Sequence, residues 1–478
     1  MFMTAIDLLR SPVVLAAAEP DQLLPAREQM AFTLGFHIIL VPFGVALTTL
    51  MLIANHRGLR KGDEAAILLA KRWSKVAALL FAVGAITGTV LSFEMGLLWP
   101  GLMKKYGAAF GFPFAIEGLF FFLEAIFVAI YIYGWDRMRP WAHFWSGVPV
   151  ALASVGGAGA VIAANSWMNQ PGGITVRGGE VVAVQPAKVF FNDAFWLEFW
   201  HMLLAAYIVA GFVVAGVYTV GMLRGRRNHY HRTGFLISFV TAAIALPVQI
   251  FVGDLIARQV FDKEPAKFAA IEMLPKTGDH VPEVLGGVLI DGEVRYGLPV
   301  PGVASILAGY RPSTTIQGLE AVPEAVRPTT AQVNIVHWAF DIMVGTSMLM
   351  LAVAVWFAWL WWKRRNTLDS NRWFLRAASV CGVVSILTLE SGWVVTEVGR
   401  QPWTVVGLLL TRDAVTTQGN LWWSFGGVVV LYTAVGAGAL WVLRSMTKRW
   451  HEQGDESVRV PYGPSEESEP AAAEGKVS

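Results

Sequence analysis

The sequence contains only one cysteine, Cys381, among its 478 residues. A chain with a single thiol forms no internal disulfide framework, no cluster held by several cysteines and no thiol pair. Charged residues are also scarce, because Asp, Glu, Lys and Arg make up 15% of the chain, against about 25% in soluble domains. The net charge of +2 says little by itself, because in a membrane the placement of charge matters more than its sum, and we expect no nucleic-acid partner. The low charge content excludes an ordinary soluble domain.

Apolar residues take the place of the missing charges. The chain is 55% hydrophobic, contains 20 tryptophans and has a mean hydropathy of +0.51. A helix needs about 20 apolar residues to cross the hydrocarbon core of a bilayer, and nine stretches are long enough. They cover about 30–54, 74–98, 112–134, 143–167, 196–223, 233–254, 335–362, 373–398 and 421–443. We therefore expect an all-α polytopic membrane protein with about nine transmembrane helices.

The connections between these stretches alternate in basic content. The richer set contains Arg57, Arg60, Lys61, Lys71 and Arg72; Arg137 and Arg139; Arg224, Arg226, Arg227 and Arg232; Lys363, Arg364, Arg365 and Arg372; and Arg444, Lys448 and Arg449. The poorer set contains Lys104 and Lys105; Arg177 and Lys188; and Arg400 and Arg412. Because basic connections stay in the cytoplasm, the pattern predicts an N-terminus outside and a C-terminus inside.

Five segments follow from this pattern. Residues 1–26 form an N-terminal interfacial segment, because the apolar run from Val13 to Ala18 is too short for a signal peptide. Residues 27–254 contain transmembrane helices 1–6, and residues 335–445 contain helices 7–9. The intervening residues 255–334 form a long extracytoplasmic loop, and loops of this length are usually functional. Residues 446–478 form a cytoplasmic tail that we expect to be disordered.

Glu390 is a carboxyl group within an apolar helix. A charge in the bilayer costs about 3 kcal/mol even on insertion scales, so such a group has a partner, a proton or a metal. The helix ends in the turn Gly399-Arg400-Gln401-Pro402-Trp403. Arg400 and the two tryptophans of this stretch, Trp393 and Trp403, suit a membrane interface and planar anions. We interpret the stretch from Glu390 to Trp403 as a functional site.

Three other side chains in the spans are suited to haem iron. His37 lies in the first span, where a histidine is more often a ligand or proton relay than a hydrogen-bonded core residue. His201 and Met343 lie at similar shallow depths, because the fifth and seventh spans both enter from outside. One His and one Met can hold a six-coordinate haem. Packing is the alternative for Met343, since most of the 15 methionines must pack, and His337 is a competing candidate or an interface residue.

The third span contains two acids, Glu117 and Glu124. A spacing of seven residues places them on one helix face, about 10 Å apart along the axis. Such a pair predicts a proton path, and the alternative is a structural hydrogen bond from each acid to a neighbouring helix. The candidate iron ligands lie in the outer part of the spans and Glu124 lies deeper. If the iron ligands hold redox cofactors, reduction of oxygen at this outer site would consume protons. Protons drawn from inside to that site would generate membrane potential without a pump.

The predicted outer loop contains Lys267-Phe268-Ala269-Ala270-Ile271-Glu272. Lys267 and Glu272 could hydrogen-bond a quinone headgroup, and Glu272 could accept its proton on oxidation. Taken alone, these residues are better explained as an exposed helical turn that carries ordinary charges.

Together, these segments resemble subunit I of cytochrome bd quinol oxidase over nearly the whole membrane portion. The matching motifs are Arg27-Glu28-Gln29, Val41-Pro42, Ala115-Ile116-Glu117-Gly118, Gly134-Trp135-Asp136-Arg137, Ala164-Asn165-Ser166-Trp167-Met168, Val252-Gly253-Asp254, Lys267 to Glu272 and Glu390 to Trp403, with His37, Glu124, His201 and Met343. Each motif alone is weak, but their order and placement across nine spans make the resemblance specific.

The resemblance implies two b-type haems and one d-type haem. It assigns His201 and Met343 to the low-spin b-type haem, and His37 and Glu390 to the two high-spin haems, without deciding which residue binds haem d. The remaining assignments are Arg400 and Trp393 beside the haems, Lys267 and Glu272 at the quinol, Glu117 and Glu124 in proton delivery and high-spin haem stability, and Asp254 at the loop entrance.

The chain departs from the family pattern in three ways. Many family members have an arginine two residues before the methionine ligand, where this chain has Asp341. An anion there should lower the haem potential unless it is protonated or turned away. Glu117 and Glu124 are one residue closer together than in many members. Glu94 stands in a motif that differs from the family's, so it inherits no role.

The resemblance implies a haem-containing subunit of a terminal respiratory oxidase in the bacterial cytoplasmic membrane. This quinol:oxygen oxidoreductase would oxidise quinol at the outer face and reduce oxygen to water with protons from the cytoplasm. A second membrane subunit and a small single-span subunit are candidate partners. Two alternatives are open: a haem-free proton-coupled transporter or channel, and a bd-like oxidase in which b-type haem replaces d-type haem.

Overall fold

The computed structural model describes residues 20–364, 368 and 370–454. Within them, nine helices are long and apolar enough to cross a membrane, which confirms the expected all-α architecture. The first span is Leu23–Lys61, in which α2 (Leu23–Pro42), a π-helical turn (Phe43–Leu47) and α3 (Thr48–Lys61) are continuous. The other spans are α4 (Glu64–Leu97), α5 (Pro100–Gly134), α6 (Pro140–Asn169), α8 (Phe195–Leu223), α9 (His229–Lys263), α12 (Thr330–Arg364), α13 (Arg372–Gly399) and α15 (Leu421–Gln453).

The starts of several spans are encoded locally. The side chains of Asp63, Asn228 and Asn371 accept a backbone hydrogen bond from the first turns of α4, α9 and α13. Helices α5 and α6 begin at Pro100 and Pro140, where the missing N–H has no cost because the first helical N–H groups have no intrahelical partner. These residues divide the apolar sequence into separate helices joined by short connections.

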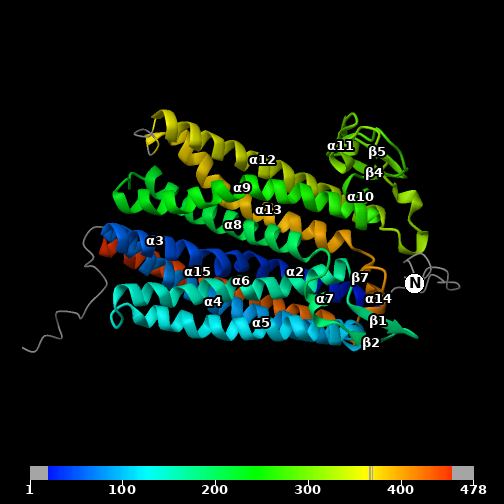
Figure 1. The fold of residues 1–478 in the computed structure, drawn as a ribbon, viewed down its shortest axis with the longest axis horizontal. Coiled ribbons are helices and arrows are strands. Elements are labelled where there is room, and N and C mark those ends of the chain that lie inside the picture. The colour runs from blue at the N-terminus through cyan, green and yellow to red at the C-terminus, as the bar shows by residue number, and fades with distance from the viewer. Residues whose placement is uncertain (1–19, 365–367, 369, 455–478) are drawn as a thin grey trace, which may run out of the picture.

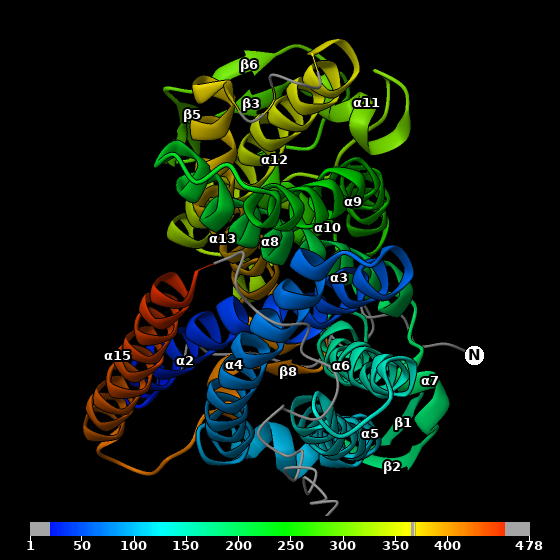
Figure 2. The same ribbon diagram turned by 90° about the vertical axis from the view of Figure 1, so that its left-hand side faces the viewer.

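The spans run roughly parallel to the long axis of the molecule (Figure 1). Viewed along that axis, α8, α9, α12 and α13 form one group beside a second group that contains α2, α4, α5, α6 and α15 (Figure 2). Aromatic side chains including Phe212, Phe239, Phe357 and Phe374 pack inside the first group. Helix α2 contacts both α8 and α13, so the two groups meet along the first span.

Helices α5 and α15 present most of their apolar surface outward. Only 6% of the apolar window of each is buried within the chain. Leu119 and Phe122 on α5, and Val430, Leu440 and Trp441 on α15, are exposed. Because such side chains are unfavourable in water, these surfaces face lipid or another membrane chain.

One end of the bundle carries the long connection between α9 and α12, and we call it the loop end (Figure 1). The connection covers residues 264–329, because α9 and α12 extend beyond the predicted boundaries of 255–334. It contains α10 (Pro265–Ile271), the antiparallel pairs β3 (Glu283–Leu285) with β6 (Leu298–Val300) and β4 (Val288–Ile290) with β5 (Glu293–Arg295), α11 (Val303–Gly309), and 3-10 turns at Leu319–Ala321 and Glu324–Val326.

Shorter elements complete the loop end. They are the hairpin β1 (Ile174–Arg177) and β2 (Glu180–Val184), α7 (Pro186–Phe190), the pair β7 (Trp403–Val405) and β8 (Leu409–Leu410), and α14 (Thr411–Ala414). The turn that follows Glu390 in the sequence therefore continues into a small β-pair that lies against the helix ends.

Both terminal segments differ from their predicted bounds. Helix α2 begins at Leu23, within the predicted interfacial segment, and residues 1–19 lie outside the described part. Helix α15 continues to Gln453, so residues 446–453 of the predicted disordered tail are helical. This extension is held by Arg72, which donates to the carbonyl oxygens of Trp450 at 3.3 Å and Gly454 at 2.9 Å. Residues 455–478 lie outside the described part.

Candidate functional site

His201 and Met343 lie on α8 and α12, within the same group of four helices. The Nδ1 atom of His201 is buried and has no hydrogen-bond partner among the described residues. A Cβ atom at Gly253 of α9 would lie 3.4 Å from His201 Cε1, and one at Gly392 of α13 would lie 3.1 Å from Met343 Sδ. Both candidate ligands thus pack closely against a glycine of a neighbouring helix.

His37 of α2 faces Thr87 and Gly88 of α4, and Glu390 of α13 faces Gly35 of α2. The Thr87 hydroxyl donates to Val83 O at 3.0 Å, so it accepts from His37 Nδ1 at 2.8 Å and leaves the Nε2 lone pair available. Orientation of a ring by this kind of hydrogen bond is typical of a metal-binding histidine. Glu390 Oε1 is buried without a partner in the described chain, and Oε2 would lie 3.5 Å from a Cβ at Gly35. Two unused metal-binding groups therefore lie near the same part of α2.

Arg400 caps α13 at the loop end. Its Nη2 pairs with Glu397, whereas its buried Nε and Nη1 have no partner among the residues described. Arg27 of α2 reaches the same turn and donates to Gln401 Oε1 at 2.9 Å. Two unused donors of a planar guanidinium suit a carboxylate such as a haem propionate. Trp393, one of the predicted cofactor-binding residues, is partly buried and packs against an apolar cluster from α6 and α8.

A chain of polar residues that the sequence analysis did not assign leads away from Arg400. Glu397 accepts from Asn165 at 2.8 Å, and Asn169 donates to Asn165 Oδ1 at 3.4 Å and to Glu198 at 3.3 Å. These partners come from α13, α6 and α8, so packing alone brings them together. The only indication of these residues in the sequence was that each is a polar side chain within an apolar span.

Glu117 and Glu124 both lie on α5 and are partly buried. Ser154 of α6 donates to Glu124 Oε1 at 2.7 Å. Glu124 therefore has the structural hydrogen bond that was the alternative to a proton path. This bond leaves the second carboxyl oxygen of Glu124 available for a proton.

Lys267 and Glu272 lie near the two ends of α10 and are buried, with 7% and 5% of their surface exposed. Their interpretation as an exposed helical turn is therefore wrong. Lys267 Nζ pairs with Glu264 at 2.9 Å. Its stem packs on Gly399, where a Cβ would lie 3.0 Å from Lys267 Cγ. Helix α10 thus lies directly on the turn that carries Arg400.

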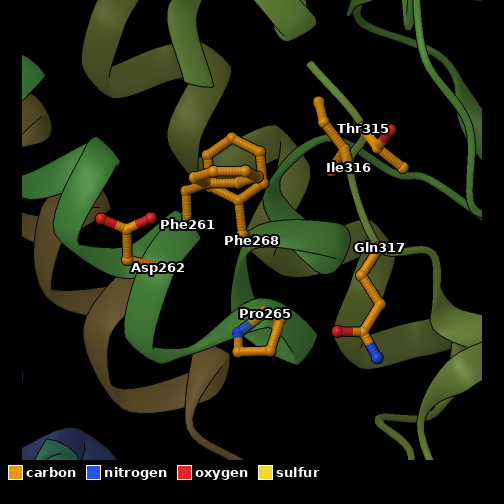
Figure 3. Close-up of a pocket in the computed structure, with 7 residues that line it drawn as sticks. All are labelled: Phe261, Asp262, Pro265, Phe268, Thr315, Ile316 and Gln317. Carbon is orange, nitrogen blue, oxygen red and sulfur yellow. The ribbon is translucent and has the colours of Figure 1, made fainter. Parts of the chain in front are cut away.

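A cavity of about 290 Å³ opens beside α10 (Figure 3). It is lined by Phe261, Asp262, Pro265, Phe268, Thr315, Ile316 and Gln317. The ring centroids of Phe261 and Phe268 are 5.3 Å apart, and Gln317 lies across the cavity from them (Figure 3). Aromatic rings with a few polar groups suit a flat, weakly polar ligand such as a quinone headgroup. The sequence analysis missed this cavity because its residues come from separate elements.

His337 is not available to a metal. Its Nδ1 lies 2.7 Å from Ile271 O and its Nε2 lies 2.9 Å from Gly286 O. Because carbonyl oxygens only accept hydrogen bonds, both ring nitrogens donate, and the alternative assignment of His337 as an iron ligand is wrong. Asp341 is turned toward the loop, where it accepts from Gly286 N at 2.5 Å. Asp341 Oδ2 also lies 3.6 Å from His337 Nε2, so its contacts are with the loop and the start of α12.

Comparisons with known proteins agree in both sequence and structure. A family model described as cytochrome bd terminal oxidase subunit I matches residues 25–451. The putative cytochrome bd menaquinol oxidase subunit I of Bacillus subtilis is 32% identical over 432 residues, which cover 88% of this chain and 96% of that protein. The cytochrome bd-II ubiquinol oxidase subunit 1 of Escherichia coli is 28% identical, over 85% of this chain and 93% of that protein. The bd oxidase structure from Geobacillus thermodenitrificans gives a TM-score of 0.84 at 32% identity, over 91% of this chain and 100% of the solved one.

Proposed function

The chain belongs to the family of cytochrome bd terminal oxidase subunit I, a membrane quinol:oxygen oxidoreductase, and we propose that quinol is oxidised at its loop end. Family membership implies haem cofactors and a complex of several subunits. It also decides against the haem-free transporter that the spans alone left open.

The proposed cofactors are two b-type haems and one d-type haem. His201 and Met343 would hold the low-spin haem, and His37 and Glu390 the two high-spin haems. When bound, haem supplies electron transfer and the reduction of oxygen. The supporting observation is the set of buried, unused atoms at His201 Nδ1, Glu390 Oε1 and Arg400 Nε and Nη1. Leaving such groups unpaired costs about 1–3 kcal/mol each, so we infer that a bound haem pairs with them.

We propose that residues of α10 and the adjacent cavity bind quinol and accept its proton. Lys267 would hydrogen-bond the headgroup and Glu272 would accept its proton, because both are buried at α10 and Lys267 packs against the turn of Arg400. The cavity at Phe268 offers the headgroup a flat, partly aromatic surface on the same short helix.

We further propose that the loop end faces outward and that protons reach the oxygen site from the cytoplasm. The basic connections predicted to be cytoplasmic join helices at the end of the bundle opposite the loop end. Glu124 and Glu117 would carry protons along α5. Because protons would be taken up inside and released outside, turnover would generate membrane potential without a pump.

The exposed surfaces of α5 and α15 support the proposed partners. A second membrane subunit would cover one apolar surface, and a small single-span subunit is a further candidate. The rest would contact lipid.

Pigment extraction from the purified oxidase tests the cofactor proposal. We expect b-type and d-type haem in a ratio of about two to one, since each proposed ligand set holds one haem. The reduced-minus-oxidised spectrum should contain a band near the red end of the visible range. A spectrum without that band would indicate that b-type haem replaces d-type haem, and a preparation without stoichiometric iron would contradict the proposal.

Glu124→Gln tests the proton path. The amide keeps the size of the side chain but cannot carry a proton, so we expect oxygen consumption to fall by about a hundred-fold while the haem spectra remain. Ser154→Ala is the matched control, because it removes the hydrogen bond and keeps the acid. Equal losses in the two variants would assign Glu124 a structural role instead.

A further inference from the structure

Glu272 has a second carboxyl group beside it. Glu283, the first residue of β3, is partly buried, and its carboxyl is the neighbouring acid that interacts with the Glu272 carboxyl. The Oε2 atoms of both residues are buried and have no N–H or hydroxyl donor among the described residues. Glu272 is 5% exposed, so its carboxyl is shielded from bulk water.

Two carboxyl groups can hydrogen-bond to each other only through a proton, so the pair shares at least one. Burial and the adjacent charge of Glu283 raise the pKa of Glu272 well above its usual range. Burial also raises the pKa of Glu283, although the hydrogen bond from Glu272 and the charge of His337 oppose this. Asp341 raises the pKa of both acids. The pKa of both acids is therefore raised, and the pair holds its shared proton more tightly than a solvated carboxyl would.

The pair is held in place by the first turns of α12. His337 donates to Ile271 O, next to Glu272, and to Gly286 O, close to Glu283 in the sequence. Trp338 donates to Gly287 O at 2.8 Å. One helix therefore binds both chain segments that carry the acids, and this rigid support keeps the two carboxyls together. The same helix carries Met343, so the pair is built on an element that also holds a proposed haem ligand.

We propose that Glu283 is a further proton acceptor for quinol oxidation and that it passes protons from Glu272 to the outer medium. This inference rests on the proposed oxidation of quinol at the loop end. Quinol loses two O–H bonds and two electrons, and the electrons go to the oxidase's haem. The shared proton moves from Glu272 to Glu283, Glu272 takes one proton from quinol, and Glu283 releases its proton to water, so the pair again holds one proton. Two such cycles return the pair to its starting state for each quinol oxidised.

Glu283→Gln in the purified oxidase tests this proposal, with duroquinol as the electron donor. We expect kcat to fall by about ten-fold with little change in KM, because the relay is lost and binding is not. The neighbouring charge no longer raises the pKa of Glu272, so that acid ionises at lower pH. The acid limb of the pH profile should therefore move down by about one pH unit. Glu293→Gln, which changes an exposed acid of the same loop, should behave as the parent.

Two further variants keep the outcome decisive. Glu283→Asp keeps an acid and should restore most of the turnover and the parent pH profile. An Asp variant as slow as the Gln variant would overturn the proposal in favour of a structural role. Tetramethyl-p-phenylenediamine reduces the haems without quinol, so turnover with this donor should be unchanged in Glu283→Gln and in Glu283→Asp. A fall in that turnover would show that the substitution misfolds the loop.

Glu272→Gln separates this inference from the function on which it rests. If Glu272→Gln loses quinol oxidation while Glu283→Gln keeps the parent rate and pH profile, Glu283 is not an acceptor and the quinol site stands. If both variants keep the parent rate, the proposed quinol site at the loop end is wrong as well.

Discussion

Replacement of His201 by alanine is expected to remove the low-spin haem spectrum and to abolish quinol oxidation. The reason is that His201 offers a buried, unused imidazole nitrogen, and a methyl group cannot replace it as an iron ligand. The high-spin haems should remain, because their proposed ligands lie elsewhere: His37 of α2 faces α4, and Glu390 of α13 faces α2. Reduced-minus-oxidised spectra with and without carbon monoxide measure both effects in one sample.

Met343→Leu provides an independent test of the same assignment. Leucine keeps the apolar bulk of methionine and lacks the thioether sulfur, so we expect the low-spin band to change to that of a five-coordinate haem. Met348→Leu is the matched control, since Met348 lies on the same helix with 45% of its surface exposed. A parent-like low-spin spectrum in His201→Ala or in Met343→Leu would show that the ligand concerned is wrongly assigned.

Replacement of Glu390 by glutamine is expected to remove one high-spin haem and almost all oxygen reduction. The amide has the size of the acid but is a poor ligand for iron because it carries no charge. Changes to groups that only orient a metal ligand lower activity by 10–100-fold, so loss of the ligand itself should exceed about a hundred-fold. Oxygen consumption, carbon monoxide binding and pigment extraction measure the loss.

Two controls make the expected effect of Glu390→Gln specific. The low-spin spectrum should survive in Glu390→Gln, because His201 and Met343 lie on other helices. Glu180→Gln, which alters an exposed acid in the β1–β2 hairpin, should keep full activity. Full haem content in Glu390→Gln would contradict the assignment of Glu390 as a ligand.

The number and type of the spans could be predicted from the sequence because each is a long apolar run bounded by a local stop. Asp63, Asn228 and Asn371 are polar residues that end one connection and cap the next helix. The exact ends were less predictable, as α15 shows. Its last turns are polar and read as a tail, but Arg72 from α4 binds their carbonyl oxygens.

The site residues could be named from the sequence when they were chemically out of place in an apolar span, as Glu390 and His201 were. The polar residues that contact them in the folded protein could not be named from the sequence. Glu198, Asn169 and Asn165 lie on α8 and α6, and Glu283 is one of several acids in a long loop. Nothing in the order of residues indicates which polar groups will meet after folding.

What the sequence by itself determined is the membrane architecture and the set of unusual polar residues, because both follow from the cost of placing charge in hydrocarbon. What only the tertiary structure decided is how those residues are used. It engages both nitrogens of His337 in hydrogen bonds, turns Asp341 toward the loop and pairs Glu272 with Glu283. Hydrogen bonds and charge pairs depend on separations of a few ångströms, and packing between elements sets those separations.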